Sequence, residues 1–283
     1  MSISKENNLY SKIPIKGFYT NQVYIVQPND TLSYARKIMF KYNISRVVVS
    51  DNGKVVGILS LRDIALILTK LGSDYPESLS LITVKKVMKN KVITLPTEAN
   101  AKEACEIMYH EKIGSVVILQ DNELTGIFSK TDACKVFQQY PIESIKVRDV
   151  MSSRFANVNI FSSFNKIVEK FIEGFDIVIV EDNKNPVGVI TLSKIATMDE
   201  NEILKSKSSL IRGNEEFTKI KIGNVAERLM YKIDIAININ EKLIKAVNLI
   251  LSYNLPALPV IDINGEIVGT ISKNDVVKII AMN

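Results

Sequence analysis

The chain has 283 residues, of which 46% are hydrophobic and 24% charged, and its formal net charge is +5 at pH 7. This composition is typical of a globular protein large enough for two domains, and it excludes a disordered chain. No apolar run approaches the roughly 20 residues that a membrane helix needs, and the first ten residues lack the pattern of a signal peptide. We therefore expect a cytoplasmic protein, with no membrane association, whose two cysteines, Cys105 and Cys134, are reduced and buried.

Taken in chain order, residues 13–71 form the first of several similar units. A short strand is expected to lead into a helix capped by Asp30, with apolar residues at helical spacing. Two strands then flank Asp51-Asn52-Gly53, which is a hairpin signal, and a second helix ends the unit. The predicted order is therefore strand, helix, strand, strand, helix.

The same order returns in residues 84–140, 147–198 and 224–283, so the predicted fold class is α+β with four repeats. We number these units repeat 1 to repeat 4. The polar stretch 199–223 is expected to be an insertion that forms a loop or a surface helix. Because a single unit has little core, the repeats are expected to fold in pairs.

Each repeat places one seven-residue pattern, here called the corner, between its last strand and its last helix. A corner has glycine first, a hydroxyl residue fourth and, in three repeats, aspartate seventh. The four corners are Gly57–Asp63, Gly126–Asp132, Gly188–Lys194 and Gly269–Asp275. In repeat 3 an ammonium group stands where the others have a carboxylate, so this cleft is expected to be empty or to bind its ligand differently.

Two interpretations of the corner stay open. In the first, the hydroxyl and the carboxylate form a capping box that starts the last helix. That box does not require a glycine three residues earlier, which in a strand marks the close approach of a ligand or of another backbone. In the second, the helix N-terminus and the hydroxyl bind a phosphate, while the aspartate accepts hydrogen bonds from a ribose.

The repeats contain the corner and open with pairs such as Val87-Met88 and Val150-Met151. In both features they resemble the CBS domain, which is named after cystathionine beta-synthase. The resemblance covers nearly the whole chain. It implies that repeats pair into Bateman modules, here residues 1–143 and 144–283, with adenosine nucleotides bound in the clefts. Four copies resemble the gamma subunit of AMP-activated protein kinase, in which two modules form a disc.

The resemblance also implies which residues contact the nucleotide. The corner aspartates would bind ribose and the corner serines would lie near phosphate. Arg46 would contact phosphate, with Ser115, Asp176 and Ala257 near the matching places. Lys130 and Lys273 either add charge from a neighbouring repeat or are ordinary solvated lysines. The full predicted set is Arg46, Ser60, Arg62, Asp63, Thr94, Ser129, Lys130, Asp132, Thr191, Ser272, Lys273 and Asp275, with Ile25, Ile93 and Ile235 against the base.

No catalytic or metal-binding pattern stands out, and His110 is the only histidine, so we expect neither an enzyme nor a metal site. The leading hypothesis is a regulatory protein that binds AMP, ADP or ATP in up to three clefts and controls an unidentified partner protein. A homodimer stays open. The alternatives are a nucleic-acid-associated CBS protein, which the net positive charge would favour, and a structural adaptor with vestigial clefts.

Overall fold

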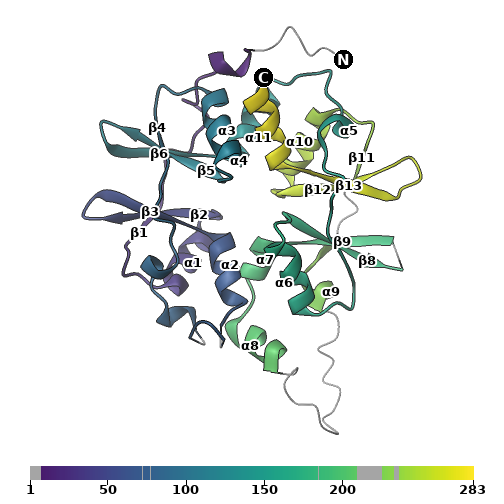
Figure 1. Ribbon diagram of the computed structural model, residues 1–283, viewed down its shortest axis with the longest axis horizontal. Helices are drawn as coiled ribbons and strands as arrows, with labels where there is room; N and C mark the ends of the chain where they lie inside the picture. Colours follow the sequence, from purple (N-terminus) through teal and green to yellow (C-terminus); the bar gives the residue numbers. More distant parts are fainter. Residues whose placement is uncertain (1–7, 72, 77, 184, 209–224, 233–235) are drawn as a thin grey trace. The chain divides into compact units, whose positions relative to one another are not determined.

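The computed structural model in Figure 1 describes residues 8–283 except 72, 77, 184, 209–224 and 233–235. It is an α+β structure with four small sheets, one for each repeat, and the predicted fold class is confirmed. None of the helices in the described part of the chain combines the length and the apolar character that crossing a membrane requires.

All four repeats have the predicted order of elements, which we call the body of the repeat. Repeat 1 consists of β1 (Ile25–Val26), α1 (Leu32–Lys41), β2 (Arg46–Asp51), β3 (Lys54–Ser60) and α2 (Leu61–Leu68). Repeat 2 consists of β4 (Thr94–Pro96), α3 (Ala101–His110), β5 (Ser115–Gln120), β6 (Glu123–Ser129) and α4 (Lys130–Gln139). Repeat 3 consists of β7 (Asn157–Asn159), α6 (Phe164–Ile172), β8 (Ile177–Asp182), β9 (Asn185–Thr191) and α7 (Leu192–Ala196). Repeat 4 consists of β11 (Ile237–Asn238), α10 (Leu243–Ser252), β12 (Ala257–Ile261), β13 (Ile267–Ser272) and α11 (Lys273–Met282).

In each sheet the first strand runs parallel to the second, and the second pairs antiparallel with the third through a tight hairpin. Alternate strand residues point to opposite faces, so Val47 and Val49 enter the apolar core of repeat 1 while Arg46 does not. One predicted cap was wrong. The cap of α1 is Thr31, whose hydroxyl accepts the amide hydrogen of Tyr34 at 3.2 Å, whereas the Asp30 carboxylate accepts from the Gln27 amide.

The segment ahead of each body, here called its lead-in, pairs with another repeat. The lead-in of repeat 1 joins the sheet of repeat 2 through Thr20 and Ile127, and the lead-in of repeat 2 joins repeat 1 through Lys89 and Ile58. The lead-in of repeat 3 contains α5 (Val147–Val150) and pairs with β13 of repeat 4. The lead-in of repeat 4 contains α9 (Val225–Leu229) and β10 (Tyr231–Lys232), and β10 pairs with β9 of repeat 3. The lead-ins are therefore exchanged reciprocally, between repeats 1 and 2 and between repeats 3 and 4. The remaining short helices are η1 (Tyr10–Lys12), η2 (Leu79–Leu81) and η3 (Val84–Lys86).

The chain divides into two compact units, each of which contains two bodies. Unit 1 comprises residues 1–23, 92–154 and 235–283, and unit 2 comprises residues 24–91 and 155–234. In unit 1 the helices of repeats 2 and 4 pack together, with α11 against α3 and α4 (Figure 1). In unit 2 the main packing between repeats 1 and 3 is α2 against α7. The predicted division into modules at residue 143 groups the repeats in a different way and stays a prediction.

Within unit 2 the half-buried Arg36 connects repeat 1 to the start of the predicted insertion. Arg36 of α1 donates to the carbonyl oxygens of Ala196, at 2.7 Å, and Met198, at 2.6 Å, and it lies 3.5 Å from Glu200. The other oxygen of Glu200 accepts the amide hydrogen of Leu79 at 3.0 Å. Burial lowers the pKa of Arg36, and the nearby carboxylate of Glu200 opposes this effect. The insertion begins as α8 (Glu200–Ser208), as one alternative predicted, and residues 209–223 lie outside the described part.

Both cysteines are expected to resist thiol reagents in the folded protein. Cys105 and Cys134 are buried, and burial raises the pKa of Cys134 to about 12 and that of Cys105 well above 9.0. At pH 8 a disulfide reagent should therefore modify no thiol before unfolding and two afterwards. Because the pKa is higher in the folded state than in the unfolded state, the contribution of the two thiols to the free energy of unfolding should be constant up to about pH 8 and fall as the pH rises toward 12. Rapid labelling of either thiol without denaturant would contradict this burial.

Candidate functional site

The corners of repeats 1, 2 and 4 are capping boxes, which confirms the first interpretation of the pattern. In repeat 1, Oδ2 of Asp63 accepts the Ser60 amide hydrogen at 2.9 Å and the Ser60 hydroxyl at 2.5 Å. The Asp63 amide in turn donates to the Ser60 hydroxyl oxygen at 3.3 Å. At Ser129 and at Ser272 the aspartate half of the box forms in the same way, with Oδ2 of Asp132 and of Asp275 accepting from the serine amide and hydroxyl. The local reason is that a hydroxyl at the cap and a carboxylate three residues later satisfy amide groups that the helix leaves unpaired.

This geometry changes the role predicted for the corner hydroxyl. The hydrogen of the Ser60 hydroxyl goes to Asp63, so this serine offers a phosphate no donor while the box is closed. The other carboxylate oxygen of Asp63, Oδ1, makes no hydrogen bond with any residue in the described part of the chain. Asp63 is half-buried, and this oxygen has the lone pairs to accept from two ribose hydroxyls.

The corner glycines are explained by the close approach of an exchanged lead-in, through its backbone or through a side chain. A Cβ atom at Gly57 would come within 2.6 Å of the Met88 sulfur, and one at Gly188 within 2.6 Å of the Tyr231 carbonyl oxygen. At Gly269 the same atom would overlap the carbonyl oxygen of Ser152. In each case the obstacle belongs to an exchanged lead-in, and the methionine of that lead-in (Met88, Met230 or Met151) packs against the glycine. The glycine therefore serves strand pairing between repeats.

Strand register places Arg46 directly beside the corner of repeat 1. Arg46 on β2 is the cross-strand partner of Ser60 on β3, so the two side chains leave the same face of the sheet. The residues at the same register in the other repeats are Ser115, Ile177 and Ala257. Asp176, which the resemblance puts near the matching place in repeat 3, directly precedes Ile177. Only repeat 1 therefore has a cation opposite its corner hydroxyl.

The second predicted cation of repeat 1 is already bound within unit 2. Arg62 donates to the carbonyl oxygen of Phe171 at 3.0 Å, near the end of α6, and lies 4.0 Å from the carboxylate of Asp176. Both partners belong to repeat 3. The electronegative end of a helix favours a cation, so this contact is a stable alternative to a ligand phosphate.

In unit 1 the corners of repeats 2 and 4 lie close together. The ammonium group of Lys273 donates to the Thr131 hydroxyl at 2.9 Å, so Lys273 is not an ordinary solvated lysine. Lys130 is half-buried, and Asp275 is half-buried as well. Asp132, by contrast, is only 2% exposed, and its Oδ1 accepts from Lys135 at 2.9 Å. Lys135 is a residue that the pattern did not single out.

The corner of repeat 3 has a cap but no carboxylate. Thr191 is buried and accepts the Lys194 amide hydrogen at 3.2 Å. The ammonium group of Lys194 lies 5.5 Å from the ring centre of Tyr231, which is cation–π distance. This arrangement presents an ammonium group and an aromatic ring in place of a ribose acceptor.

The three candidates for contact with a base do not occupy equivalent places. Ile25 on β1 is 48% exposed and pairs with Val48, and its counterpart in repeat 2 is Thr94, which is also exposed. Ile93 precedes Thr94 and corresponds to Tyr24, whose ring stacks on Tyr42 at 3.9 Å. Ile235 lies outside the described part of the chain. The exposed apolar side chain of Ile25 is therefore the candidate that the structure leaves accessible.

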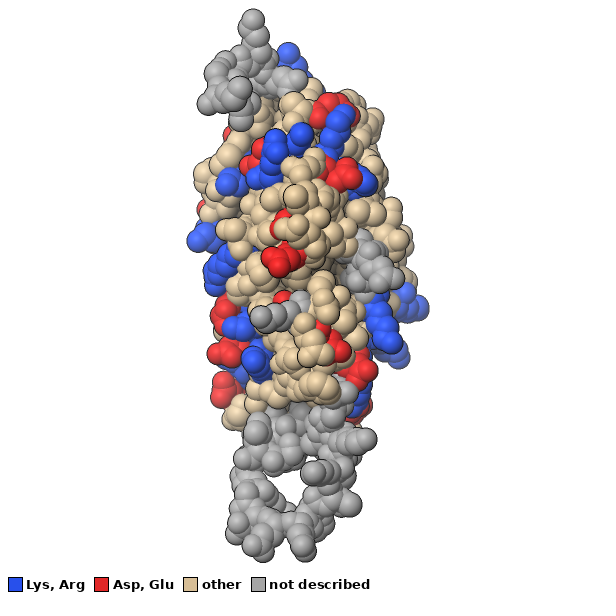
Figure 2. Space-filling view, turned by 90° about the vertical axis from the view of Figure 1, so that its right-hand side faces the viewer, with Lys and Arg blue, Asp and Glu red and all other residues tan. Residues whose placement is uncertain are grey.

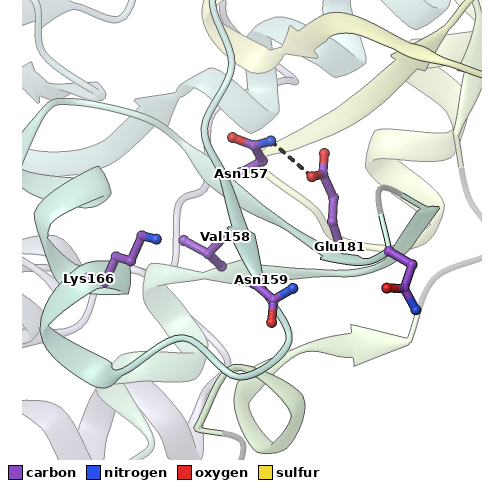
Figure 3. Close-up of a pocket in the computed structure, with 6 residues that line it drawn as sticks. Asn157, Val158, Asn159, Lys166 and Glu181 are labelled. Carbon is purple, nitrogen blue, oxygen red and sulfur yellow. Dashed lines mark hydrogen bonds between the residues drawn. The ribbon is translucent and has the colours of Figure 1, made fainter.

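One open hollow of about 510 Å³ lies away from the corners, in repeat 3. Figure 3 shows Asn157 reaching toward Glu181, to which it donates at 3.0 Å, while Lys166 extends from α6. None of the predicted residues lines this hollow. On the face drawn in Figure 2, basic and acidic side chains are interspersed, without the continuous basic stripe of a nucleic-acid groove. No group of three or more His, Cys, Asp or Glu side chains in the described residues is placed to bind a metal ion.

The fold and the corners define a tandem-repeat protein made of four similar α+β units. The CBS domain family matches residues 15–70, 84–139, 147–199 and 225–282, and the chain belongs to this family. The four predicted repeats are thereby confirmed.

Among the proteins with similar chains are two archaeal ones that match over nearly their full length. Protein MJ1225 of Methanocaldococcus jannaschii is 25% identical over 281 residues, which cover 92% of this chain and 96% of that protein. Its crystal structure, reported as that of a suggested archaeal homologue of g-AMPK, matches with a TM-score of 0.77 at 24% identity, over 94% of this chain and 99% of that one. An uncharacterized conserved protein from Pyrococcus horikoshii matches with a TM-score of 0.63 at 17% identity, over 95% and 100% of the two chains. These structures share the four-repeat fold.

A further relative, the uncharacterized protein MJ1232 of Methanocaldococcus jannaschii, is 34% identical over 116 residues. That match covers 41% of this chain and 36% of the relative, so the similarity spans about a third of the length of MJ1232.

Proposed function

We propose that this chain is a non-catalytic regulatory protein that binds AMP, ADP or ATP and thereby controls a partner protein in the cytoplasm. The observation that carries the proposal is the corner of repeat 1, where Arg46, Ser60 and Asp63 share one end of a sheet with the exposed Ile25. The description of MJ1225 as a suggested homologue of g-AMPK agrees with this chemistry.

In this site each part of the nucleotide meets a suitable group. The guanidinium group of Arg46 suits a phosphate because it offers several donors in a planar arrangement. Oδ1 of Asp63 accepts from the ribose hydroxyls, and Ile25 provides an apolar surface for the base. Repeat 4 is the second candidate, since it has Ser272 and Asp275 but an alanine in place of the arginine. Repeat 3 has no ribose carboxylate.

The reciprocal exchange of lead-ins supports the pairing of repeat 1 with repeat 2 and of repeat 3 with repeat 4, so we keep residues 1–143 and 144–283 as the proposed modules. A nucleotide would act as a switch only if it bound one arrangement of the modules more tightly than another, because a ligand shifts an equilibrium by its differential affinity. The partner would recognise the favoured arrangement. Such a protein could act as a monomer or as a homodimer.

Isothermal titration calorimetry of the purified full-length chain with AMP, ADP and ATP tests the proposal. Replacing Arg46 with alanine should weaken the binding of ATP about tenfold and that of AMP less, because a hydrogen bond to a charged group contributes about 1.5–3 kcal/mol. Arg228→Ala is the matched control, since this exposed arginine forms its ion pair within the described part of the chain with Glu202, away from the corner of repeat 1. Absence of saturable binding of all three nucleotides by the unmodified chain would remove the proposal.

A further inference from the structure

The corners of repeats 1 and 2 have the same sequence pattern but hold their carboxylates differently. In repeat 2, Oδ2 of Asp132 accepts from the amide and the hydroxyl of Ser129, at 2.9 and 2.7 Å. The remaining oxygen, Oδ1, accepts from the ammonium group of Lys135 at 2.9 Å. In repeat 1 the residue three positions after the aspartate is Leu66, and Oδ1 of Asp63 bonds to no described residue.

We propose that Lys135 prevents the corner of repeat 2 from binding a nucleotide, because its ammonium group is hydrogen-bonded to the Asp132 oxygen that a ribose would need. Repeat 2 therefore takes no adenine nucleotide while Lys135 is in place. This inference rests on the proposed function in one respect, since it assumes that corner aspartates bind ribose. It goes further in assigning the closed corner to the ion pair of Lys135 with the buried Asp132. Repeat 4 has Lys278 at the matching place, but Lys278 is exposed and forms no ion pair with a described residue.

The competition between the lysine and a ribose favours the lysine. The side chain of Asp132 is 3% exposed and that of Lys135 is 48% exposed, so the carboxylate is shielded from water while the lysine stem reaches out. A charged donor makes a stronger hydrogen bond to a carboxylate than a neutral sugar hydroxyl does. The two residues are three positions apart on α4, where side chains are neighbours, so the pair needs no other element to form.

A second cation strengthens the closure from across unit 1. Lys273 of α11 donates to the hydroxyl of Thr131, the residue directly before Asp132. A ribose that approached Oδ1 would have to displace Lys135 beside this second ammonium group. In repeat 1 the residue at the position of Lys135 is Leu66, which has no charge.

The test counts the nucleotides bound by each full-length variant. Lys135→Met keeps the aliphatic stem and removes the charge, and calorimetry with AMP should find one more nucleotide per chain than in the unmodified protein. The double variant Lys135→Met with Asp132→Asn should lose the added site. Lys102→Met, a lysine on α3 of the same repeat with no ion pair among the described residues, is the control and should change nothing.

The reverse change should close the open corner. Leu66→Lys in repeat 1 places an ammonium group three residues after Asp63, and the affinity at that corner should fall at least tenfold.

Thermal unfolding of each variant identifies any that fail to fold. If the unmodified chain binds AMP and the Lys135→Met variant has the same number of sites, the inference is overturned and the proposed function is left intact. An added site in Lys135→Met, with none in the unmodified chain, would support the role of Lys135 and contradict the proposed function. Absence of binding in both would overturn both.

Discussion

Replacing Asp63 with asparagine is expected to weaken the binding of AMP to the corner of repeat 1 by about 10- to 100-fold. The reason is that a hydrogen bond to a charged acceptor contributes about 1.5–3 kcal/mol, and asparagine, whose single side-chain oxygen is taken by the Ser60 amide, places an NH2 group where the ribose would meet a carboxylate oxygen. The amide oxygen of asparagine can still accept from the Ser60 amide, so the helix cap and the fold should survive. Calorimetry measures the loss of affinity, and thermal unfolding checks the fold.

Asp132→Asn is the matched control for this loss. It makes the same change in the same kind of corner, but the Asp132 carboxylate is buried against Lys135 and, on our proposal, takes no part in nucleotide binding. It should leave the affinity and the number of bound nucleotides unchanged. If Asp63→Asn bound AMP as tightly as the unmodified chain, the corner of repeat 1 would be a helix cap and nothing more.

Replacing Gly269 with alanine is expected to lower the free energy of unfolding by about 3 kcal/mol. The added Cβ atom would overlap the carbonyl oxygen of Ser152, which belongs to the exchanged lead-in of repeat 3. That oxygen accepts the Thr270 amide hydrogen at 2.9 Å, so moving it breaks a paired backbone contact. Overpacking in a closely packed site typically destabilises by about 1–3 kcal/mol, and a backbone obstacle lies at the upper end. Unfolding in urea measures the change.

Gly57→Ala provides the comparison within the same chain. Its nearest obstacle is the sulfur atom of Met88, the far part of a flexible side chain that can rotate away. The expected destabilisation is therefore smaller, at about 1 kcal/mol. Equal effects at Gly57 and Gly269 would show that intrinsic strand preference, and not the approach of the lead-in backbone, accounts for these glycines.

The local features of the repeats were predictable because neighbouring residues create them. A capping box needs only a hydroxyl and a carboxylate three positions apart, so Ser60 and Asp63 were sufficient to indicate it. The cap at Asn100 was likewise correct, since its side chain accepts the Glu103 amide hydrogen at 2.9 Å. At the start of α1 the prediction chose Asp30 over its neighbour Thr31, because two adjacent residues can both cap and only the backbone decides between them.

The sequence by itself determined that four strand-helix-strand-strand-helix units with three complete corners make up this protein, since repetition and short-range spacing carry that information. Only the tertiary structure decided that Arg46 lies opposite its corner hydroxyl, that Arg62 is bound by repeat 3 and that Asp132 is buried beside Lys135. The physical reason is that strand register and helix packing bring together residues from distant parts of the chain. Four corners of similar sequence thus acquire different partners, and on our proposal those partners determine which carboxylate is able to accept a ligand.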